Sequence, residues 1–472
     1  MFHDNYKILA LLIGLIIVRG LIYIAIIPPW LAPDEPAHFE AIRLIGQEGL
    51  LPTRDAYLTT PMHPEMHASF QTFQVWQLSR LAPPQAPRRP DQPSSDLFID
   101  YYPPTSTGSL IIAGNYPLVY HQLMAPLSAL IRNLSLVQQV YIMRLVSLLL
   151  TTLTVVCGWF FGRTIFPAQM RYALGLTSFL VFLPMHLHVD TAINSDVLVV
   201  VLVALYFLGL AKIFCKGPSL PWLIITALAL GAAVITKPTS LFILPTTGVA
   251  LLLYGARRFY WKPRLLAGLL PVVIAIAFIG SIVLFQVGDG GRAVSTLDIA
   301  IEQPVVTGNY FSPAALAVYA YTIQWGFLSF WGLFGWANIP VLATGIRVVW
   351  LVCLGVGLGV VIFGGRHLLQ LGQQRRTLTS QQQDILLVLL CSLIFALISV
   401  YTPIIATQST RWGPPARYFF PALLPLALYF FLGYQQLIPA RFYRWTLPLW
   451  LTALFLFDTF TLAFVLIPYI YG

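Results

Sequence analysis

Charged residues are scarce in this chain. Asp, Glu, Lys and Arg make up only 9% of its 472 residues, whereas hydrophobic residues make up 58%, and the mean hydropathy is +0.78. A soluble domain carries roughly 25% charged residues, so the composition excludes a soluble globular protein. The apolar segments are continuous and long, whereas spanning strands would alternate weakly. We therefore expect an all-α polytopic membrane protein that forms a single integral-membrane domain over residues 1–472.

Cysteine is also rare, and its positions carry no pattern. The four cysteines lie in or beside apolar segments, without the paired spacing of a zinc site or a loop disulfide: Cys157, Cys215, Cys353 and Cys391. We expect them to pack in the core. The first apolar run, residues 8–27, is interrupted by Arg19 and lacks a small-residue cleavage site before Pro28. It is therefore expected to remain as the first helix and not to be a removed signal.

Long apolar runs recur along the whole chain. A window of about 19 residues places about eleven spanning helices, near residues 8–27, 144–163, 172–189, 195–214, 220–236, 240–256, 265–286, 342–363, 385–403, 416–433 and 446–470. The segment 117–131 is apolar but short and contains prolines, which favours an interfacial or re-entrant helix.

Positive charge gathers on one side of this arrangement. The basic residues of the short loops lie there: Lys7, Arg163, Arg171, Lys212, Lys216, Arg257, Arg258, Lys262, Arg264, Arg366, Arg375, Arg376, Arg441 and Arg444. The positive-inside rule makes this side, and the N-terminus, cytoplasmic. The acids fall almost wholly on the other side. The net charge of +10 therefore indicates topology and contact with membrane lipids, and no basic run with interleaved aromatics suggests nucleic acid.

Two loops on the outer side are too long to be simple connectors. The first covers residues 28–117 and includes a Pro-rich stretch at 82–96; the second covers residues 287–340. In the first loop, the run 33–36, Pro-Asp-Glu-Pro, opens a short helix that should lie along the membrane surface and stop at Gly49. The second loop has few periodic elements before an aromatic run at 324–336.

The most informative residues are two adjacent carboxylates, Asp34 and Glu35, placed just where the chain leaves the first helix. Acids at that position are candidates for chemistry at a membrane surface, with His38 four residues later able to orient them on the same helical face. The structural alternative is that Asp34 is an N-cap and Glu35 a first-turn residue favoured by the helix dipole. A histidine alone at such a position, as His38 could be, is more often an interfacial histidine.

Three basic residues are candidate phosphate ligands on the same side. Lys237 stands in the outer connection between the fifth and sixth helices, where it either meets a phosphate or extends to the headgroups. Arg411 and Arg417 flank a Gly-Pro-Pro break before the tenth helix, and arginine forks suit phosphate oxygens.

Further polar residues lie in an outer turn and within two spans. Asp190, Asn194 and Asp196 form the turn before the fourth helix, and Asn194 and Asp196 can serve as its caps. Arg19 and Asp458 lie inside spans, where either could be half of a structural pair.

Several motifs together resemble a known family. The segments PDEPAHF (33–39), YPLVYHQLMAPL (116–127), NSDVLVVVLVAL (194–205), ITKPTSLFILP (235–245), SFWGLFGW (329–336) and ARYFFPALLPLAL (416–428) are similar to the integral-membrane glycosyltransferases of the GT-C fold. More narrowly, they resemble a bacterial branch of multi-spanning proteins within that superfamily. The resemblance covers nearly the whole chain, although each motif alone is mostly apolar.

The resemblance implies an enzyme of the bacterial plasma membrane that moves a sugar from a polyprenyl-phosphate donor to a glycan, lipid or protein acceptor outside the cell. It assigns the catalytic base to Asp34, with Glu35 beside it, and the donor phosphate to Lys237, Arg411 and Arg417. Some relatives bind a divalent metal through an Asp-any-Asp motif. None stands near Asp34, so we expect neither a required metal nor a cofactor.

The residue types suit that chemistry. Transfer needs a base for the acceptor's proton and cations for the charge that gathers on the leaving phosphate. With one base and no second acid as nucleophile, the displacement should invert the anomeric centre. The main alternative is a transporter or flippase of lipid-linked sugars, but the internal repeats typical of transporters are not evident. A non-catalytic assembly or lipid-binding protein is a second alternative.

Overall fold

The computed structural model describes residues 2–51, 63–79, 118–258, 310–341, 346–372, 378–407 and 416–472. In its N-terminal half the helices are α1 (Phe2–Ile26), α2 (Glu35–Arg43), η1 (Leu44–Glu48), α4 (Pro64–Thr72), α5 (Val75–Ser79), α7 (Val119–Leu130), α8 (Leu136–Ile165), α9 (Met170–Phe182), α10 (Pro184–Asp190), α11 (Ser195–Lys216), α12 (Leu220–Thr236), η2 (Pro238–Ser240) and α13 (Ile243–Arg258). The C-terminal half contains α15 (Pro313–Gly332), β1 (Leu333–Phe334), β2 (Ile339–Pro340), α16 (Ile346–Gly372), α17 (Ser380–Thr407), η4 (Ala416–Ala422), α18 (Leu423–Leu437), η5 (Ala440–Trp445), α19 (Thr446–Phe460), η6 (Thr461–Leu466) and α20 (Ile467–Tyr471).

The chain is confirmed as a helical protein with many apolar spans. Within the described part, eight helical segments are long and apolar enough to cross a membrane: 6–26, 136–165, 195–216, 238–256, 347–367, 380–402, 416–437 and 440–471. Helices α9 and α10, bent by 61° at their junction, would together form a ninth. The residue before a proline avoids the helical region, and Leu183 precedes Pro184 with an extended backbone (ψ 109°). The proline therefore explains the bend.

The expected number of about eleven spans is not confirmed. Helix α12 is apolar but has only 17 residues, fewer than the roughly 20 that span a bilayer. The expected span at 265–286 and the Pro-rich stretch at 82–96 lie outside the described residues. The segment 117–131 contains the 12-residue helix α7 with Pro126 inside it, which is too short to cross a membrane, as expected.

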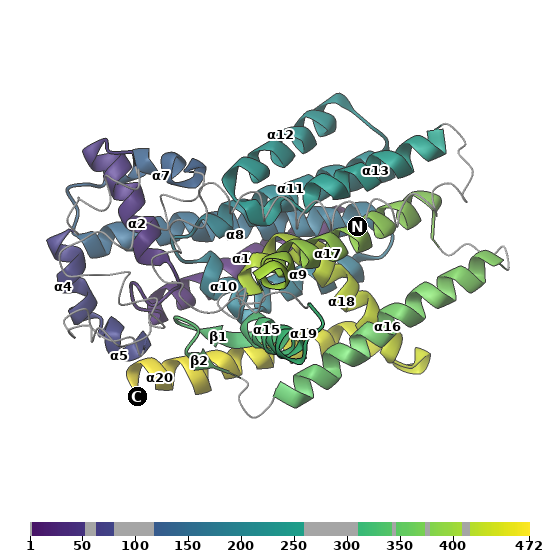
Figure 1. The fold of residues 1–472 in the computed structure, drawn as a ribbon. Helices are drawn as coiled ribbons and strands as arrows, with labels where there is room; N and C mark the ends of the chain where they lie inside the picture. Colours follow the sequence, from purple (N-terminus) through teal and green to yellow (C-terminus); the bar gives the residue numbers. More distant parts are fainter. Residues whose placement is uncertain are drawn as a thin grey trace.

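The short helices of the first long loop gather at one end of the bundle (left in Figure 1), where the C-terminus also lies. As expected, the helix that opens at Asp34 and Glu35 stops at Gly49, whose positive φ of 67° forms the cap after the π-helical turn η1. Every residue of α2 is buried, since α7 packs against it, so its apolar face meets protein. Its expected place along the membrane surface stays a prediction.

The described part of the second long loop, residues 310–340, has more regular structure than its sequence indicates. Helix α15 runs for 20 residues, begins at a Ser312 side chain that caps Ala315 and is seen nearly end-on in Figure 1, where α16 runs across the picture. A two-stranded antiparallel hairpin follows, with Leu333 opposite Pro340. The Trp336 indole of this hairpin donates to the Trp30 carbonyl oxygen at 2.9 Å. The hairpin thereby fixes the segment that carries Asp34.

Close helix contacts hold the bundle together elsewhere. Helices α16 and α18 cross at Gly359 and Gly433, where a Cβ on Gly359 would stand 2.1 Å from the Gly433 carbonyl oxygen. Small residues allow such approaches between membrane helices. Inside the bundle, Arg19 of α1 pairs with Asp458 of α19, and the Tyr23 hydroxyl donates to the same carboxylate at 3.0 Å. This pair ties the first helix to the last long one, so the structural role expected for Arg19 and Asp458 agrees with their geometry.

Candidate functional site

The segment between α1 and α2 holds Asp34 in an unusual conformation. Asp34 has φ 62° and ψ 0°, in the left-handed region, and Trp30 also has a positive φ of 72°. Such residues cost of order 1–3 kcal/mol and persist only where the surroundings hold them in place. Although Asp34 occupies the N-cap position of α2, its side chain makes no capping hydrogen bond. The alternative that Asp34 serves as a cap is therefore not what the structure shows.

The Asp34 carboxylate instead pairs with Arg417, which is 383 positions away in the sequence. Arg417 stands in the first turn of η4, and its Nη1 also donates to the Pro33 carbonyl oxygen at 3.4 Å. The Asp34 side chain is 16% exposed and that of Arg417 is 6% exposed. Two motifs from opposite ends of the chain thus meet at one point.

Two more charged residues join this pair. The Arg417 Nε lies 3.9 Å from an Asp196 carboxylate oxygen, and the Lys237 ammonium lies 2.6 Å from the other Asp196 oxygen. The Tyr418 ring is near both cations, with the Lys237 nitrogen 5.4 Å and the Arg417 Cζ 5.3 Å from its centroid. We call Asp34, Asp196, Lys237 and Arg417 the charged cluster. It contains two acids and two bases and is therefore electrically balanced.

The charged cluster is incompletely hydrogen-bonded. The buried Arg417 Nε and both Asp196 carboxylate oxygens have no partner of hydrogen-bond geometry among the described residues. Buried polar groups are usually satisfied, so each exception calls for an explanation. The ion pairs hold these groups near one another without using their full capacity for hydrogen bonds. Such groups retain the capacity to bind a polar ligand.

The electrostatics of Asp34 favour its ionised form. Burial alone would raise the pKa of Asp34, but the Arg417 guanidinium, together with smaller contributions from His38 and Lys237, holds the pKa below its usual value. Asp34 is therefore an anion at neutral pH in this state. A carboxylate paired in this way is a weak base, because its proton affinity is low.

Glu35 faces a different environment from its neighbour. Its side chain is fully buried, and Arg144 of α8 donates to both carboxylate oxygens, from Nε at 2.7 Å and from Nη2 at 2.6 Å. The backbone N–H groups of Trp30 and Ile193 donate to the same carboxylate at 2.9 and 3.2 Å. Arg144 further donates to the carbonyl oxygens of Ile27 and Pro28. Glu35 and Arg144 thus join α8, the α1–α2 segment and the turn before α11.

The His38 backbone N–H donates to the Asp34 carbonyl oxygen at 3.1 Å, whereas the His38 ring stacks on that of a second histidine, His121. The rings of His38 and His121 lie 5.1 Å apart at 21°, and one ring donates to the other across 2.8 Å between His38 Nδ1 and His121 Nε2. Burial, together with the charge of Lys237, lowers the pKa of His38 to about 3, and burial lowers that of His121 well below its usual value. Both rings are therefore neutral at physiological pH.

The polar residues in and before the turn that leads to α11 have different roles. Asn194 caps α11 by accepting from the Asp196 N–H at 2.9 Å, so the capping alternative is confirmed for Asn194. The Asp196 side chain does not cap and belongs to the charged cluster. Asp190 is buried and pairs with His186 one turn earlier in α10, at 3.0 Å. Arg411 lies outside the described residues.

Sequence reasoning missed Arg144, His121 and His186. Arg144 interrupts the apolar start of α8, and a charge at such a position usually has a partner, so this signal was available. His186 and Asp190 are spaced i, i+4 on one helix, which is also readable. His121 carried no signal of its own, because its partner is 83 positions away.

No group of three or more His, Cys, Asp or Glu side chains suited to a metal ion occurs among the described residues. The acids of the charged cluster face Lys237 and Arg417, which would repel a divalent cation. The arrangement is instead suited to binding an anion. Lys237 and Arg417 would be its ligands, and the anion would compete with Asp34 and Asp196 for them.

A family model described as "Predicted membrane protein (DUF2142)" matches residues 17–427 of the chain. The match includes all four residues of the charged cluster as well as Glu35, Arg144, His38 and His121. No match was found among curated proteins or among solved structures.

Proposed function

The chain belongs to this family of predicted membrane proteins, and we propose that it is a glycosyltransferase that uses a polyprenyl-phosphate-linked sugar. The observation that carries the proposal is the ion pair between Asp34 and Arg417, extended by Asp196 and Lys237. It supplies a candidate base and candidate phosphate ligands at one point, which is what transfer from a lipid phosphate requires. The resemblance to GT-C glycosyltransferases supports the same reading.

In this proposal Arg417 and Lys237 hold the donor phosphate. Both cations are now paired with carboxylates, so a phosphate must compete with Asp34 for Arg417. Arginine binds phosphate oxygens through parallel N–H donors, and the Arg417 Nε, which has no hydrogen-bond partner among the described residues, is a donor that a phosphate could engage first. Arg411 remains a further candidate from the sequence.

Donor binding would also activate Asp34. Once a phosphate engages Arg417, Asp34 loses the charge that holds its pKa low and gains a negative neighbour. Both changes favour protonation, so the pKa of Asp34 rises and its strength as a base increases. The ion pair thus keeps Asp34 a weak base until the donor is present. Asp34 then takes the proton of the acceptor as the sugar leaves its phosphate.

The neighbouring residues take supporting roles. Glu35 cannot serve as a base while Arg144 and two backbone N–H groups occupy its oxygens, so we assign it to holding the segment of Asp34. His38, neutral and stacked on His121, packs the first turn of α2, and its N–H donates to the Asp34 carbonyl oxygen. Asp196 is engaged by Lys237, which leaves one base and favours a single, inverting displacement.

A second candidate is a transporter of lipid-linked sugars, and the break between α9 and α10 favours it. Transporters often bind substrate at broken helices, and here the break leads to Asp190 and the turn before Asp196. Such helices usually occur in pairs related by an internal repeat. Only one bent pair was found in the described part, so we prefer the transferase.

The orientation is part of the proposal. The gathering of Lys and Arg in the short loops supports an orientation with the charged cluster on the outer side, and we assign that side to the outer face of a bacterial plasma membrane. There the acceptor would be a glycan, lipid or protein of the cell envelope.

The test is whether a covalent bond is broken. The purified protein in liposomes is supplied with polyprenyl-phosphate sugars together with an envelope extract as acceptor. We expect free polyprenyl phosphate to accumulate with time, in step with sugar on the acceptor. Movement of the intact donor from one leaflet to the other without release of polyprenyl phosphate would contradict the transferase and support the transporter.

A further inference from the structure

A buried histidine and aspartate that have no part in the proposed function lie on α10. His186 and Asp190 are one turn apart, and the His186 Nε2 lies 3.0 Å from an Asp190 carboxylate oxygen, with neither side chain exposed. No other described residue makes a hydrogen bond to the Asp190 carboxylate. A buried charge is costly unless a partner compensates it, so the charge of Asp190 depends on the protonation of His186.

The proline at the bend determines which nitrogen of His186 carries a proton. In a continuous helix the Leu180 carbonyl oxygen would accept from the N–H group four positions later. That position is Pro184, which has no N–H. The His186 Nδ1 instead lies 2.8 Å from the Leu180 oxygen. Because a carbonyl oxygen can only accept, Nδ1 is the donor and carries hydrogen.

The second nitrogen of His186 then needs a proton as well. With hydrogen on Nδ1, a neutral ring would present the lone pair of Nε2 to the Asp190 carboxylate, and two acceptors 3.0 Å apart repel each other. A proton on Nε2 turns this repulsion into an ion pair. The charged cluster is electrically balanced by itself, so Asp190 requires a further cation, which the His186 imidazolium supplies.

This ion pair lies close enough to act on the charged cluster. Asp190 ends α10 and Asp196 lies in the first turn of α11, with only a short turn between the two helices. Besides His186, the charges that act on Asp190 are those of Asp196 and Lys237. A change in the charge of the pair is therefore felt at the lysine of the charged cluster.

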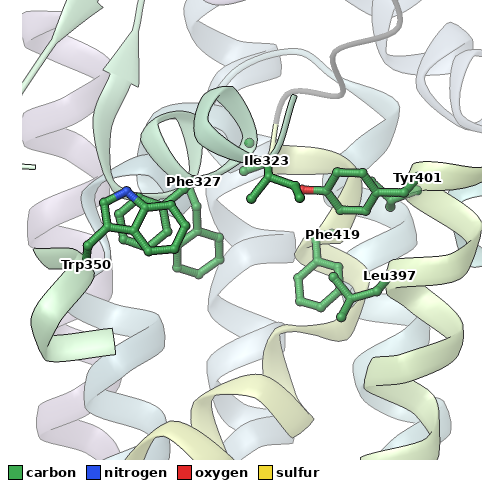
Figure 2. Close-up of a pocket in the computed structure, with 10 residues that line it drawn as sticks. Ile323, Phe327, Trp350, Leu397, Tyr401 and Phe419 are labelled. Carbon is green, nitrogen blue, oxygen red and sulfur yellow. The ribbon is translucent and has the colours of Figure 1, made fainter. Parts of the chain in front are cut away.

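The His186 ring also contacts the helix that carries Arg417. It packs against the edge of Phe420 in η4, with the ring centroids 6.1 Å apart at 82°. A 3₁₀ helix has three residues per turn, so Phe420 shares its face of η4 with Arg417. Phe419, labelled in Figure 2, lies with Ala416 on another face, which lines an apolar pocket. His186, and not this pocket, thus lies on the face of η4 that carries Arg417.

We propose that His186 is a positively charged positioning residue for the donor phosphate, which holds Asp190 in an ion pair and so keeps Lys237 available to an anion. The inference rests on the proposed role of Lys237 and Arg417 as phosphate ligands. Without the imidazolium, Asp190 would be a second carboxylate that attracts Lys237. An anion would then have to compete with two carboxylates for the lysine and not with one.

The test changes the charge of the pair and measures anion binding. His186→Gln keeps a donor for the Leu180 carbonyl oxygen but leaves the pair with one net negative charge. Asp190→Asn, alone or together with His186→Gln, leaves the pair without net charge. Each purified protein in nanodiscs is titrated with farnesyl phosphate. An uncompensated charge acts strongly on its neighbours in a protein interior, so we expect His186→Gln to bind about ten-fold more weakly and the other two variants to bind like wild type.

The comparison among these variants distinguishes charge from packing. If the pair were only structural, both single variants would bind more weakly and the double variant would be no better than either. That result would overturn the proposal, and so would wild-type affinity in His186→Gln. Restored affinity in the double variant supports it, because the double variant recovers the charge balance without recovering the ion pair.

A spectroscopic measurement on the unliganded protein tests the imidazolium directly. Histidine has an ordinary pKa of about 6.5, so an unpaired histidine is neutral at about pH 8. We expect the nitrogen NMR spectrum of protein labelled with ¹⁵N-histidine to show an imidazolium signal at this pH. The signal should be lost in Asp190→Asn, where Nε2 can accept from the asparagine amide. A wild-type spectrum with neutral rings alone would overturn the proposal even if His186→Gln fails to fold.

Failure of the proposed function would give a different result. If wild type does not bind farnesyl phosphate, the phosphate site is wrong and its positioning residue is lost with it, whatever the NMR spectrum shows. If wild type binds farnesyl phosphate and His186→Gln binds it equally well, only the role of His186 is wrong.

Discussion

Asp34 and Glu35 are adjacent acids that meet opposite environments. Glu35 is fully buried, accepts from both arms of Arg144 and from two backbone N–H groups, and keeps no capacity for a further ligand. Asp34 sits in a left-handed backbone conformation, is partly exposed and pairs with an arginine whose Nε has no hydrogen-bond partner among the described residues.

The different environments of Glu35 and Asp34 distinguish a structural role from a candidate functional one. A fully hydrogen-bonded buried pair fixes one geometry, and removing one partner leaves an uncompensated charge. Strain and unsatisfied polar groups are instead found where a ligand is to be bound. In the proposed function the neighbouring acids therefore have different roles: Glu35 holds the segment in place, and Asp34 is the candidate base within it.

The largest expected effect is the loss of stability that follows substitution of Glu35. Glu35→Gln removes the charge opposite Arg144, and breaking a buried ion pair typically costs about 3–5 kcal/mol. We therefore expect a strongly lowered Tm in detergent or a failure to accumulate in the membrane. Glu48→Gln, whose parent side chain is 38% exposed and pairs with Arg43, is the control and should melt like wild type. Equal Tm values for Glu35→Gln and wild type would remove the distinction between the two acids.

A smaller effect is expected at Arg417. Lysine keeps the charge of Arg417 but loses the planar set of N–H donors, and hydrogen bonds to charged groups contribute about 1.5–3 kcal/mol. Arg417→Lys should therefore bind farnesyl phosphate about ten-fold more weakly or worse in an equilibrium titration. Arg43→Lys changes an arginine that is paired with Glu40 and Glu48 outside the charged cluster and serves as the control. Unchanged affinity in Arg417→Lys would exclude Arg417 from the phosphate site.

The smallest effect concerns the stacked histidines and appears as a pH dependence of stability. Both His38 and His121 have folded-state pKa values below the unfolded value, so the unfolded chain takes up protons first as the pH falls below about 6.5. The Tm of wild type should therefore fall between pH 7 and pH 5. His121→Phe removes one of the two groups, so its Tm should fall less over this window. Parallel curves for the two proteins would contradict the neutral pair.

The sequence predicted much of the charged cluster. The motifs pointed to Asp34, Lys237 and Arg417, and proline and glycine signals correctly gave the start of α2 and the end of the π-helical turn η1 that follows it. Their convergence could be expected because polar residues at the ends of apolar spans must share a membrane surface. Which cation pairs with which acid could not be predicted. Partners such as Glu35 and Arg144 are 109 positions apart, so no local sequence pattern indicates the pair.

The burial of α2 and the order of α15 also escaped prediction. A short amphipathic helix shows the same hydrophobic periodicity whether its apolar face meets lipid or another helix. The packing of α7 against α2 therefore could not be predicted from the sequence. Helix α15 contains Gln324, Trp325 and three tyrosines or threonines in its middle, which lowers its hydropathy below that of a span. Its order comes from tertiary contacts with α10 and η4.

The central claim is that Asp34 is the base, and the most direct test is turnover and thermal melting of Asp34→Asn measured on the same preparation. Asparagine tolerates the left-handed conformation and keeps the side-chain shape, so we expect a Tm close to that of wild type. Loss of a general base should lower the rate of polyprenyl phosphate release by about 10² to 10⁴, while Glu48→Gln keeps the wild-type rate. A stable Asp34→Asn protein with near-normal turnover would contradict the account.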